Sequence, residues 1–184
     1  MYYIVSKYIS KAVSNIANTD IGKKWESKFK STYEKQFPGT FIYRLPDQQS
    51  GFAGGGGSNP CDFFCYPVDC MLMVECKAKS GASINFSEIR QYEKMKDYRG
   101  LEKTYPGVLV WFYEKDTIIW VSIDEMVKMK EVDGEKSIGL RMLKENYTVK
   151  YLIINVPATK LRTFMEADLK YLVEVLNEST RNEC

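Results

Sequence analysis

Two acidic residues and a lysine lie close together in a largely hydrophobic stretch of the chain. The segment 59–79 reads NPCDFFCYPVDCMLMVECKAK, with Asp62 before an expected turn and Glu75 and Lys77 inside an apolar strand. Charged residues at such positions need a partner, because burying an unpaired charge is costly. Two carboxylates near one lysine are the groups that could hold a divalent cation and act on a phosphodiester.

The expected strand geometry brings these groups together. Side chains alternate between the two faces of a strand, so Glu75 and Lys77 share one face and Cys76 points to the other. A hairpin centred near residues 68–69 places Asp62 directly opposite Glu75, at the distance of a cross-strand pair.

Two carboxylates directly opposite each other repel, so the arrangement favours a bound cation. Carboxylates with a backbone carbonyl suit Mg²⁺, which prefers oxygen ligands and keeps several waters. Such an ion polarises a phosphate and lowers the pKa of bound water, while Lys77 can stabilise negative charge developing on the phosphate. The alternative is an ordinary exposed strand face, because a Glu-x-Lys pair is common.

The sequence N-P-C-D, followed after a gap by V-E-C-K, resembles the Asp and Glu-x-Lys core of the PD-(D/E)XK nuclease superfamily. Two further segments resemble its RecU-type Holliday junction resolvases. IGKKWE at 21–26 is similar to an element of their first helix that carries an acid, here Glu26. SINFSEIRQYEKMK is similar to their segment after the lysine, which leads into a helix bearing a glutamine, here Gln91.

The resemblance implies a role for each of these residues. Asp62 and Glu75 would be metal ligands, and Glu26 would be a further acid linked to the metal. Lys77 would be the catalytic lysine, and Gln91 would position the scissile phosphate or support the metal's ligands. Without the resemblance, Glu26 reads as part of a solvated helix face and Gln91 as a surface polar residue.

The implied fold is α/β, with a restriction-endonuclease-like core and a central mixed β-sheet flanked by helices. The implied activity is Mg²⁺- or Mn²⁺-dependent cleavage of four-way (Holliday) DNA junctions in recombination and repair. Two symmetric nicks in a junction imply a homodimer. The alternatives are another nuclease of the superfamily (a restriction or repair endonuclease), a non-catalytic DNA-binding module of the same fold, or an interaction protein whose acidic pair is incidental.

Composition narrows the chemistry further. The 184 residues are 45% hydrophobic and 27% charged, with a net charge of +2, which is typical of a globular domain. Because the chain has no histidine, histidine-dependent nucleases and Ser-His triads are excluded. Basic residues near the acidic segments are candidate DNA contacts, although such runs also occur on solvated faces: Lys23, Lys24, Lys79, Arg90 and Lys94.

Four of the five cysteines lie within residues 61–76, which raises the question of a zinc site. Their spacings include no C-x2-C pair, and alternation along strands would scatter them over two faces. We therefore expect reduced thiols that pack as small hydrophobic groups. No apolar run is long enough for a transmembrane helix, and no signal peptide is recognisable, so we expect a cytoplasmic protein of a bacterium or a phage.

We expect a single nuclease domain over 1–184, with a core at about 19–122 and a C-terminal helical extension at about 123–184. A Gly-rich insert at 46–60 reads as a flexible loop. Helices are predicted at 2–17, 20–37, 85–99, 122–131, 135–145 and 159–178. Strands are predicted at 40–45, 61–66, 70–78, 107–113, 117–122 and 151–156.

Overall fold

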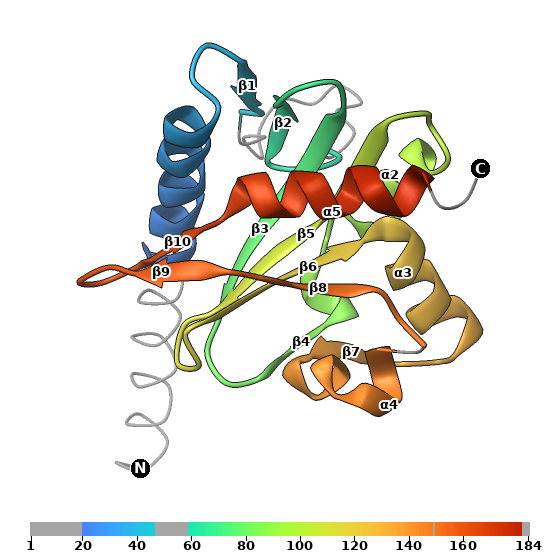
Figure 1. Ribbon diagram of the computed structural model, residues 1–184. Helices are drawn as coiled ribbons and strands as arrows, with labels where there is room; N and C mark the ends of the chain where they lie inside the picture. Colours follow the sequence, from blue (N-terminus) through green and yellow to red (C-terminus); the bar gives the residue numbers. More distant parts are fainter. Residues whose placement is uncertain (1–19, 47–58, 149, 182–184) are drawn as a thin grey trace, which may run out of the picture.

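The computed structural model describes residues 20–46, 59–148 and 150–181. Its centre is a six-stranded sheet in the order β1-β2-β3-β5-β6-β8, in which β3 and β5 are parallel and the other neighbours antiparallel. Helices lie on both sides of this sheet (Figure 1), so the expected α/β class with a central mixed sheet is confirmed. The strands are β1 (Phe41–Arg44), β2 (Phe63–Tyr66), β3 (Met71–Lys79), β5 (Thr104–Phe112), β6 (Thr117–Ser122) and β8 (Ile153–Val156).

One face of the sheet is covered by the helix of residues 20–36 and by α5 (Leu169–Arg181). Aromatic residues recur every four positions along the first helix, so they form one stripe that faces the strands. Trp25 packs against Trp111 of β5 with ring centroids 5.3 Å apart, and Phe29 packs against Phe63 of β2 at 5.0 Å. This packing sets the helix beside the β2–β3 hairpin.

The other face is covered by short helical pieces and a small two-stranded sheet, over the buried strand residues Val108, Val110 and Ile119. The pieces are η1 (Phe86–Glu88), α2 (Tyr92–Met95), η2 (Lys96–Tyr98), α3 (Ile123–Val127), η3 (Lys128–Val132), η4 (Leu140–Leu143) and α4 (Glu145–Thr148). The small sheet pairs β4 (Ser83–Asn85) with β7 (Ser137–Gly139). Residues 80–103 thus connect the parallel strands β3 and β5.

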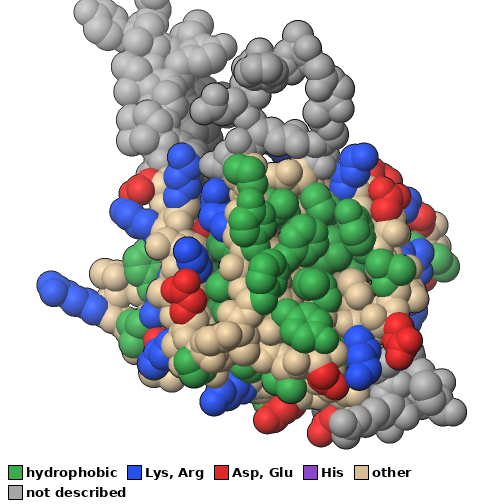
Figure 2. All heavy atoms as spheres, turned by 90° about the horizontal axis from the view of Figure 1, so that it is seen from above, with side chains coloured by type: hydrophobic (Ala, Val, Ile, Leu, Met, Phe, Trp, Pro, Cys, Tyr) green, Lys and Arg blue, Asp and Glu red, His purple; other side chains and the backbone are tan. Residues whose placement is uncertain are grey.

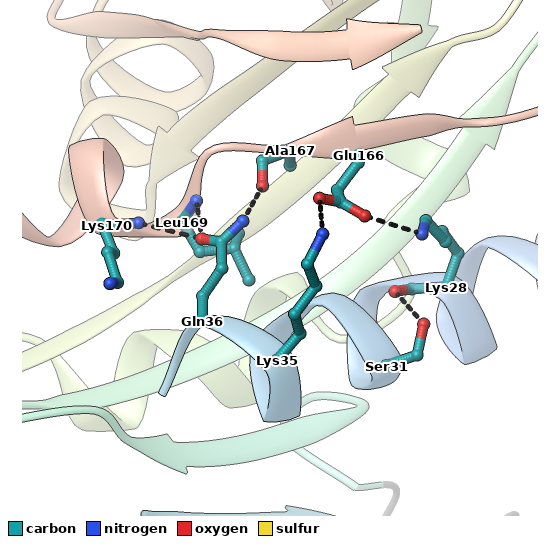
Figure 3. Close-up of polar contacts among 8 residues, drawn as sticks. All are labelled: Lys28, Ser31, Lys35, Gln36, Glu166, Ala167, Leu169 and Lys170. Carbon is teal, nitrogen blue, oxygen red and sulfur yellow. Dashed lines mark hydrogen bonds and ion pairs between the residues drawn. The ribbon is translucent and has the colours of Figure 1, made fainter. Parts of the chain in front are cut away.

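Polar contacts tie helix 20–36 to the C-terminal part of the chain (Figure 3). The Glu166 carboxylate forms ion pairs with Lys35 Nζ at 2.7 Å and with Lys28 Nζ at 3.2 Å. The Gln36 amide donates to the Ala167 carbonyl at 2.8 Å and accepts the Leu169 backbone N–H at 2.8 Å. Since free N–H groups at a helix start need acceptors, Gln36 stabilises α5 as it anchors its own helix.

Three predicted helices differ from the structure. Residues 85–99 form η1, α2 and η2 in place of one helix, and the three-residue spacing of Phe86, Ile89 and Tyr92 matches 3₁₀ turns. Residues 135–145 contain β7 and η4, because Ser137 pairs with the distant Asn85. Such non-local pairing overrides local propensity.

Residues 159–178 also differ from the single helix predicted there. The first part forms a hairpin of β9 (Ala158–Lys160) and β10 (Met165–Ala167), so residues 123–184 supply strands as well as helices. In the sequence Phe164 fits a helical spacing, but in the structure its ring packs on Trp111 with the ring centroids 5.3 Å apart. The helix begins at Leu169, where Asp168 accepts the Tyr171 N–H at 3.0 Å as an N-cap.

The predicted helix at 20–37 and the predicted strands are found, with shifts of up to three residues at their ends. Ser122 caps α3 as expected, accepting the Glu125 N–H at 3.3 Å. The helix predicted at 2–17 and nearly all of the insert 46–60 lie outside the described residues. In the part of the chain that is described, no helix combines the length and the hydrophobicity needed to cross a bilayer.

The four clustered cysteines, Cys61, Cys65, Cys70 and Cys76, are free thiols and are buried, as expected for packing residues. Burial raises the pKa of the Cys70 thiol to about 11 and that of Cys61 to about 12. These thiols therefore stay protonated at neutral pH and behave as apolar groups. Cys184 lies outside the described residues.

Candidate active site

The β2–β3 hairpin has the register expected from the sequence. Phe63 lies opposite Val74, and Asp62, which directly precedes β2, lies close enough to Glu75 for its charge to raise the Glu75 pKa. The Asp62 N–H donates to the Val74 carbonyl at 3.0 Å. Because β2 begins at Phe63, the N–H of Cys76 lies beyond the strand pair and donates instead to the Asp62 carboxylate at 2.8 Å.

Glu75 is completely buried, and its Oε1 lies 2.6 Å from Lys77 Nζ. The two side chains share one face of β3, whereas Val74 and Cys76 pack into the core on the other face. Alternation along the strand is thus as expected. Glu75 Oε2 has no hydrogen-bond partner among the described residues, so this buried carboxylate is only half satisfied.

Burial shifts the proton equilibria of both acids. It raises the pKa of Glu75 to about 8; the Lys77 charge opposes this shift and the nearby Asp62 carboxylate adds to it. Burial also raises the pKa of Asp62 to about 6. The hydrogen bond from the Cys76 N–H partly opposes this rise, because it stabilises the charged form of Asp62. For Lys77, burial lowers the pKa, but the attraction of Glu75 outweighs it and the net shift is upward. Around neutral pH, Glu75 therefore keeps its proton unless a cation compensates its charge, whereas Asp62 is mostly ionised.

These residues line an open cleft of ≈ 720 Å³. All five predicted catalytic residues contribute to it: Glu26, Asp62, Glu75, Lys77 and Gln91. Helix 20–36, the β2–β3 hairpin and the η1–α2 segment meet there, which the sequence order alone does not require. The remaining lining residues are Gly22, Lys23, Cys76, Ser87, Glu88 and Arg90.

Glu26 stands apart from the two hairpin acids. Its Oε2 accepts hydrogen bonds from Arg44 Nη2 at 2.7 Å and from Arg44 Nε at 3.2 Å. These charge-assisted bonds join Glu26 to β1. Its charge still raises the pKa of Asp62. Among residues 20–46, 59–148 and 150–181, no three acids or cysteines are gathered closely enough to form a metal-binding group, although Glu26 and the two hairpin acids all line the cleft.

The donor set of the cleft fits a hard cation with oxygen ligands. Glu75 Oε2 and Gln91 Oε1 are buried acceptors without partners in the described structure. The Cys76 carbonyl points to the same side of β3 as its N–H, toward Asp62, because both groups of a strand residue face one neighbour. Carboxylate and amide oxygens thus line one open cleft, which has room for waters.

The predicted DNA contacts divide into two groups. Lys23 and Arg90 are exposed and line the cleft, where they can meet a phosphate backbone. Lys24 is paired with Asp20, and Lys79 is paired with the cleft residue Glu88. Lys94 of α2 is exposed but lies outside the residues that line the cleft.

Two cleft-related residues were not anticipated. Arg44 ends β1 and holds Glu26, and Glu88 lines the cleft and holds Lys79. Arg44 could have been noticed as the one charge in the apolar strand segment TFIYRL. Glu88 had a local signal as well, since it forms a capping box with Asn85 at the start of η1.

Comparison with known proteins gives a likeness in structure but none in sequence. No protein-family model and no curated protein matches the sequence. Among solved structures, the chain is similar to Hjc, a Holliday junction resolvase from the archaeal hyperthermophile Archaeoglobus fulgidus, with a TM-score of 0.44. The aligned residues are 16% identical and cover 70% of this chain and 98% of that chain. A likeness of this size carries no argument about chemistry, so the function proposed below is supported by the cleft itself.

Proposed function

We propose that the cleft is the active site of a divalent-metal-dependent nuclease. The observation that carries this proposal is the completely buried Glu75, which is paired with Lys77 at 2.6 Å and lies near Asp62 among the residues that line an open cleft. A carboxylate without water around it is costly unless a cation compensates its charge. Lys77 compensates the charge at one oxygen of Glu75, and the nearby Asp62 carboxylate adds a second negative charge that a bound cation would balance.

The residues would divide the work between them. Asp62 and Glu75 would hold Mg²⁺ or Mn²⁺, and the bound ion would supply Lewis-acid polarisation of the phosphate and a water of lowered pKa. Lys77 would place its positive charge where negative charge develops on the phosphate. Gln91 would orient a water through its unpartnered amide oxygen or donate from its NH₂ group to a phosphate oxygen, and Lys23 and Arg90 would bind the flanking backbone.

We further propose branched DNA as the substrate, with four-way junctions as the first candidate. The cleft is open, and its exposed Lys23 and Arg90 are phosphate-binding groups, which recognise backbone shape rather than base sequence. Resolution of a junction requires two nicks related by symmetry, so the active form would be a homodimer. A linear-duplex endonuclease of the same chemistry is the competing possibility, and the choice of substrates separates the two.

Metal binding can be tested without a cleavage assay. Mg²⁺ should raise the melting temperature of the wild type at pH 8, since a ligand that binds only the folded state stabilises it. The same addition should leave the melting temperature of Asp62→Asn nearly unchanged, because that variant lacks one of the two charged ligands. Asp69→Asn is the matched control, as Asp69 lies exposed on the same hairpin. An equal Mg²⁺ shift in all three proteins would argue against the site.

Activity is then read on a synthetic four-way junction beside linear, nicked and flap duplexes of equal length. Asp62→Asn and Lys77→Ala should each reduce Mg²⁺-dependent cleavage by about 10²-fold or more, the usual loss when one charge-stabilising group is removed. Asp69→Asn should cleave like the wild type. Undiminished cleavage by both cleft variants would refute the assignment, and cleavage of linear duplex at one sequence would overturn the choice of junctions.

A further inference from the structure

On the outer face of β1 and β2, four aromatic side chains are exposed or partly exposed. Phe41 and Tyr43 of β1 and Tyr66 of β2 are 54%, 51% and 44% exposed, and Phe64 is partly exposed. Figure 2 views the molecule from above Figure 1 and shows hydrophobic side chains gathered on this upper side. Figure 1 draws β1 and β2 on the same side. Exposed aromatic clusters of this kind mark binding surfaces more often than isolated apolar residues do.

The strand register shows that these rings form one surface. Phe41 pairs with Tyr66, and Tyr43 pairs with Phe64, so the four rings stand in two rows on the same face of the sheet. The intervening residues Phe63 and Cys65 point into the core on the opposite face. We call the four aromatic residues the aromatic platform.

The aromatic platform continues into the candidate active site. Asp62 precedes Phe64 by two residues, and Glu75 follows Met73 by two residues, while Met73 lies opposite Phe64. Residues two apart share a face and are about 7 Å apart along a strand. Glu75 is thus in the next row of the same sheet face, beyond the Tyr43–Phe64 row, and Asp62 lies near it.

The type of side chain in these rows indicates the type of ligand. Phenylalanine and tyrosine rings stack on nucleobases without regard to sequence, as in proteins that bind single strands on an open sheet. No charged side chain interrupts the two rows, and the cleft residues Lys23 and Arg90 can bind phosphates. Bases of a duplex are already stacked on one another, so only unpaired bases can use the rings.

We propose that the aromatic platform binds unpaired nucleotides next to the scissile phosphate, so that the preferred substrates are DNA branches with a single-stranded segment. This inference rests on the proposed nuclease function, because that function fixes where the bound nucleotides lie relative to the cleaved phosphate. The binding itself requires only the rings and the neighbouring basic groups. Stacking of the unpaired bases fixes the strand on the sheet, and the next phosphate along it enters the row of Asp62 and Glu75.

Binding is measured by the anisotropy of a fluorescein-labelled oligothymidylate in EDTA, where no cleavage takes place. The double variant Phe41→Ala/Tyr43→Ala should weaken binding by at least about fivefold per ring, the lower end for loss of base stacking. Tyr43→Phe should keep the wild-type affinity, because it keeps the ring. The dependence of affinity on salt should be unchanged in every variant, since no phosphate contact is removed.

Tyr171→Ala provides the matched control, because Tyr171 of α5 is 39% exposed and lies on the helix that covers the opposite face of the sheet. This variant should bind oligothymidylate like the wild type. Thermal unfolding of each variant checks the fold, and Tyr66→Ala replaces the double variant if that protein does not fold. Wild-type affinity in both ring-deleted proteins would overturn the proposal.

Two further results separate the possible failures. If wild-type protein binds no oligothymidylate and the double variant changes the molar mass in solution, the platform is an interface between two copies of the chain and the proposal is wrong. If oligothymidylate binding depends on the rings but the wild type cleaves no branched DNA, the platform stands and the proposed nuclease function fails. If the wild type cleaves gapped junctions faster than fully paired ones and the double variant loses this preference, both the aromatic platform and the proposed nuclease function are supported.

Discussion

The backbone N–H of Cys76 donates to the Asp62 carboxylate at 2.8 Å, just beyond the first residue of β2. A side chain thus takes the place of the missing strand partner and continues the β2–β3 ladder by one position. The contact holds the Asp62 carboxylate near Glu75 before any ligand arrives. Preorganisation of this kind reduces the cost of gathering two like charges around a cation.

Replacing Asp62 separates its structural role from its chemical role. Asp62→Ala leaves the buried Cys76 N–H without an acceptor, which should lower the free energy of unfolding by about 1–3 kcal/mol. Asp62→Asn retains an oxygen acceptor and should cost less, although it loses the charge. Urea denaturation of both variants, with Asp69→Ala as the exposed control, measures the difference. Equal stability of Asp62→Ala and the wild type would show that the contact contributes nothing.

The metal-free protein should lose stability as pH rises from about 4.5 to about 8. Glu75 has a pKa of 4.5 when unperturbed and about 8 when folded, so the folded state binds more protons than the unfolded state in this range. Glu75→Gln resembles the protonated acid and should remove most of the slope, an effect on the order of a few kcal/mol near pH 8. Melting temperatures in EDTA across this range provide the test. A slope that is identical in Glu75→Gln would assign the pH dependence to other groups.

Gln36 should be important for the attachment of helix 20–36. Gln36→Leu has a similar shape but loses the bonds to the Ala167 carbonyl and the Leu169 N–H, and should lower the free energy of unfolding by about 1–3 kcal/mol. Glu34→Leu, at an exposed position of the same helix, should change it by less than about 0.5 kcal/mol. Chemical denaturation of both variants gives the comparison, and similar values for the two would contradict the anchoring role.

Gly107 of β5 leaves space for a neighbouring indole. A Cβ at this position would lie 2.4 Å from Trp120 Cζ2 and 2.7 Å from the Val121 carbonyl oxygen. Gly107→Ala should therefore destabilise the fold by about 1–3 kcal/mol through overpacking. Gly22→Ala is the contrast, because no atom lies within 4 Å of its added Cβ and the residue is helical, so stability should be equal or higher. Thermal unfolding distinguishes the two, and a stabilised Gly107→Ala would show that Trp120 moves aside easily.

Local signals were sufficient for the hairpin of the candidate site. The alternation of Val74, Glu75 and Cys76, with a turn at residues 67–70, predicted both the register and the faces of β3, because a one-residue slip would have buried the wrong set. The four-residue spacing of aromatic residues in helix 20–36 was equally informative. Both signals are contained within one element or one hairpin.

The rest depended on contacts between distant segments. Ser137 and Asn85 pair across two short strands, and neither neighbourhood signals a strand by itself. The ion pair of Arg44 with Glu26 joins β1 to the first helix and keeps that acid beside the hairpin, a geometry that spacing in the chain does not contain. Leu161 and Phe164 matched a helical period but belong to the β9–β10 turn region, where pairing of the strands decided the outcome.

The bridge from Gln36 to the first turn of α5 joins positions 133 residues apart. Contacts between such distant positions close long loops and form only after most of the chain is available. A chain still attached to the ribosome before residue 169 has emerged has helix 20–36 without this anchor, and Glu26 and Lys23 are on that helix. The wall of the cleft that this helix supplies is therefore held by a contact that can form only after residue 169 has been synthesised.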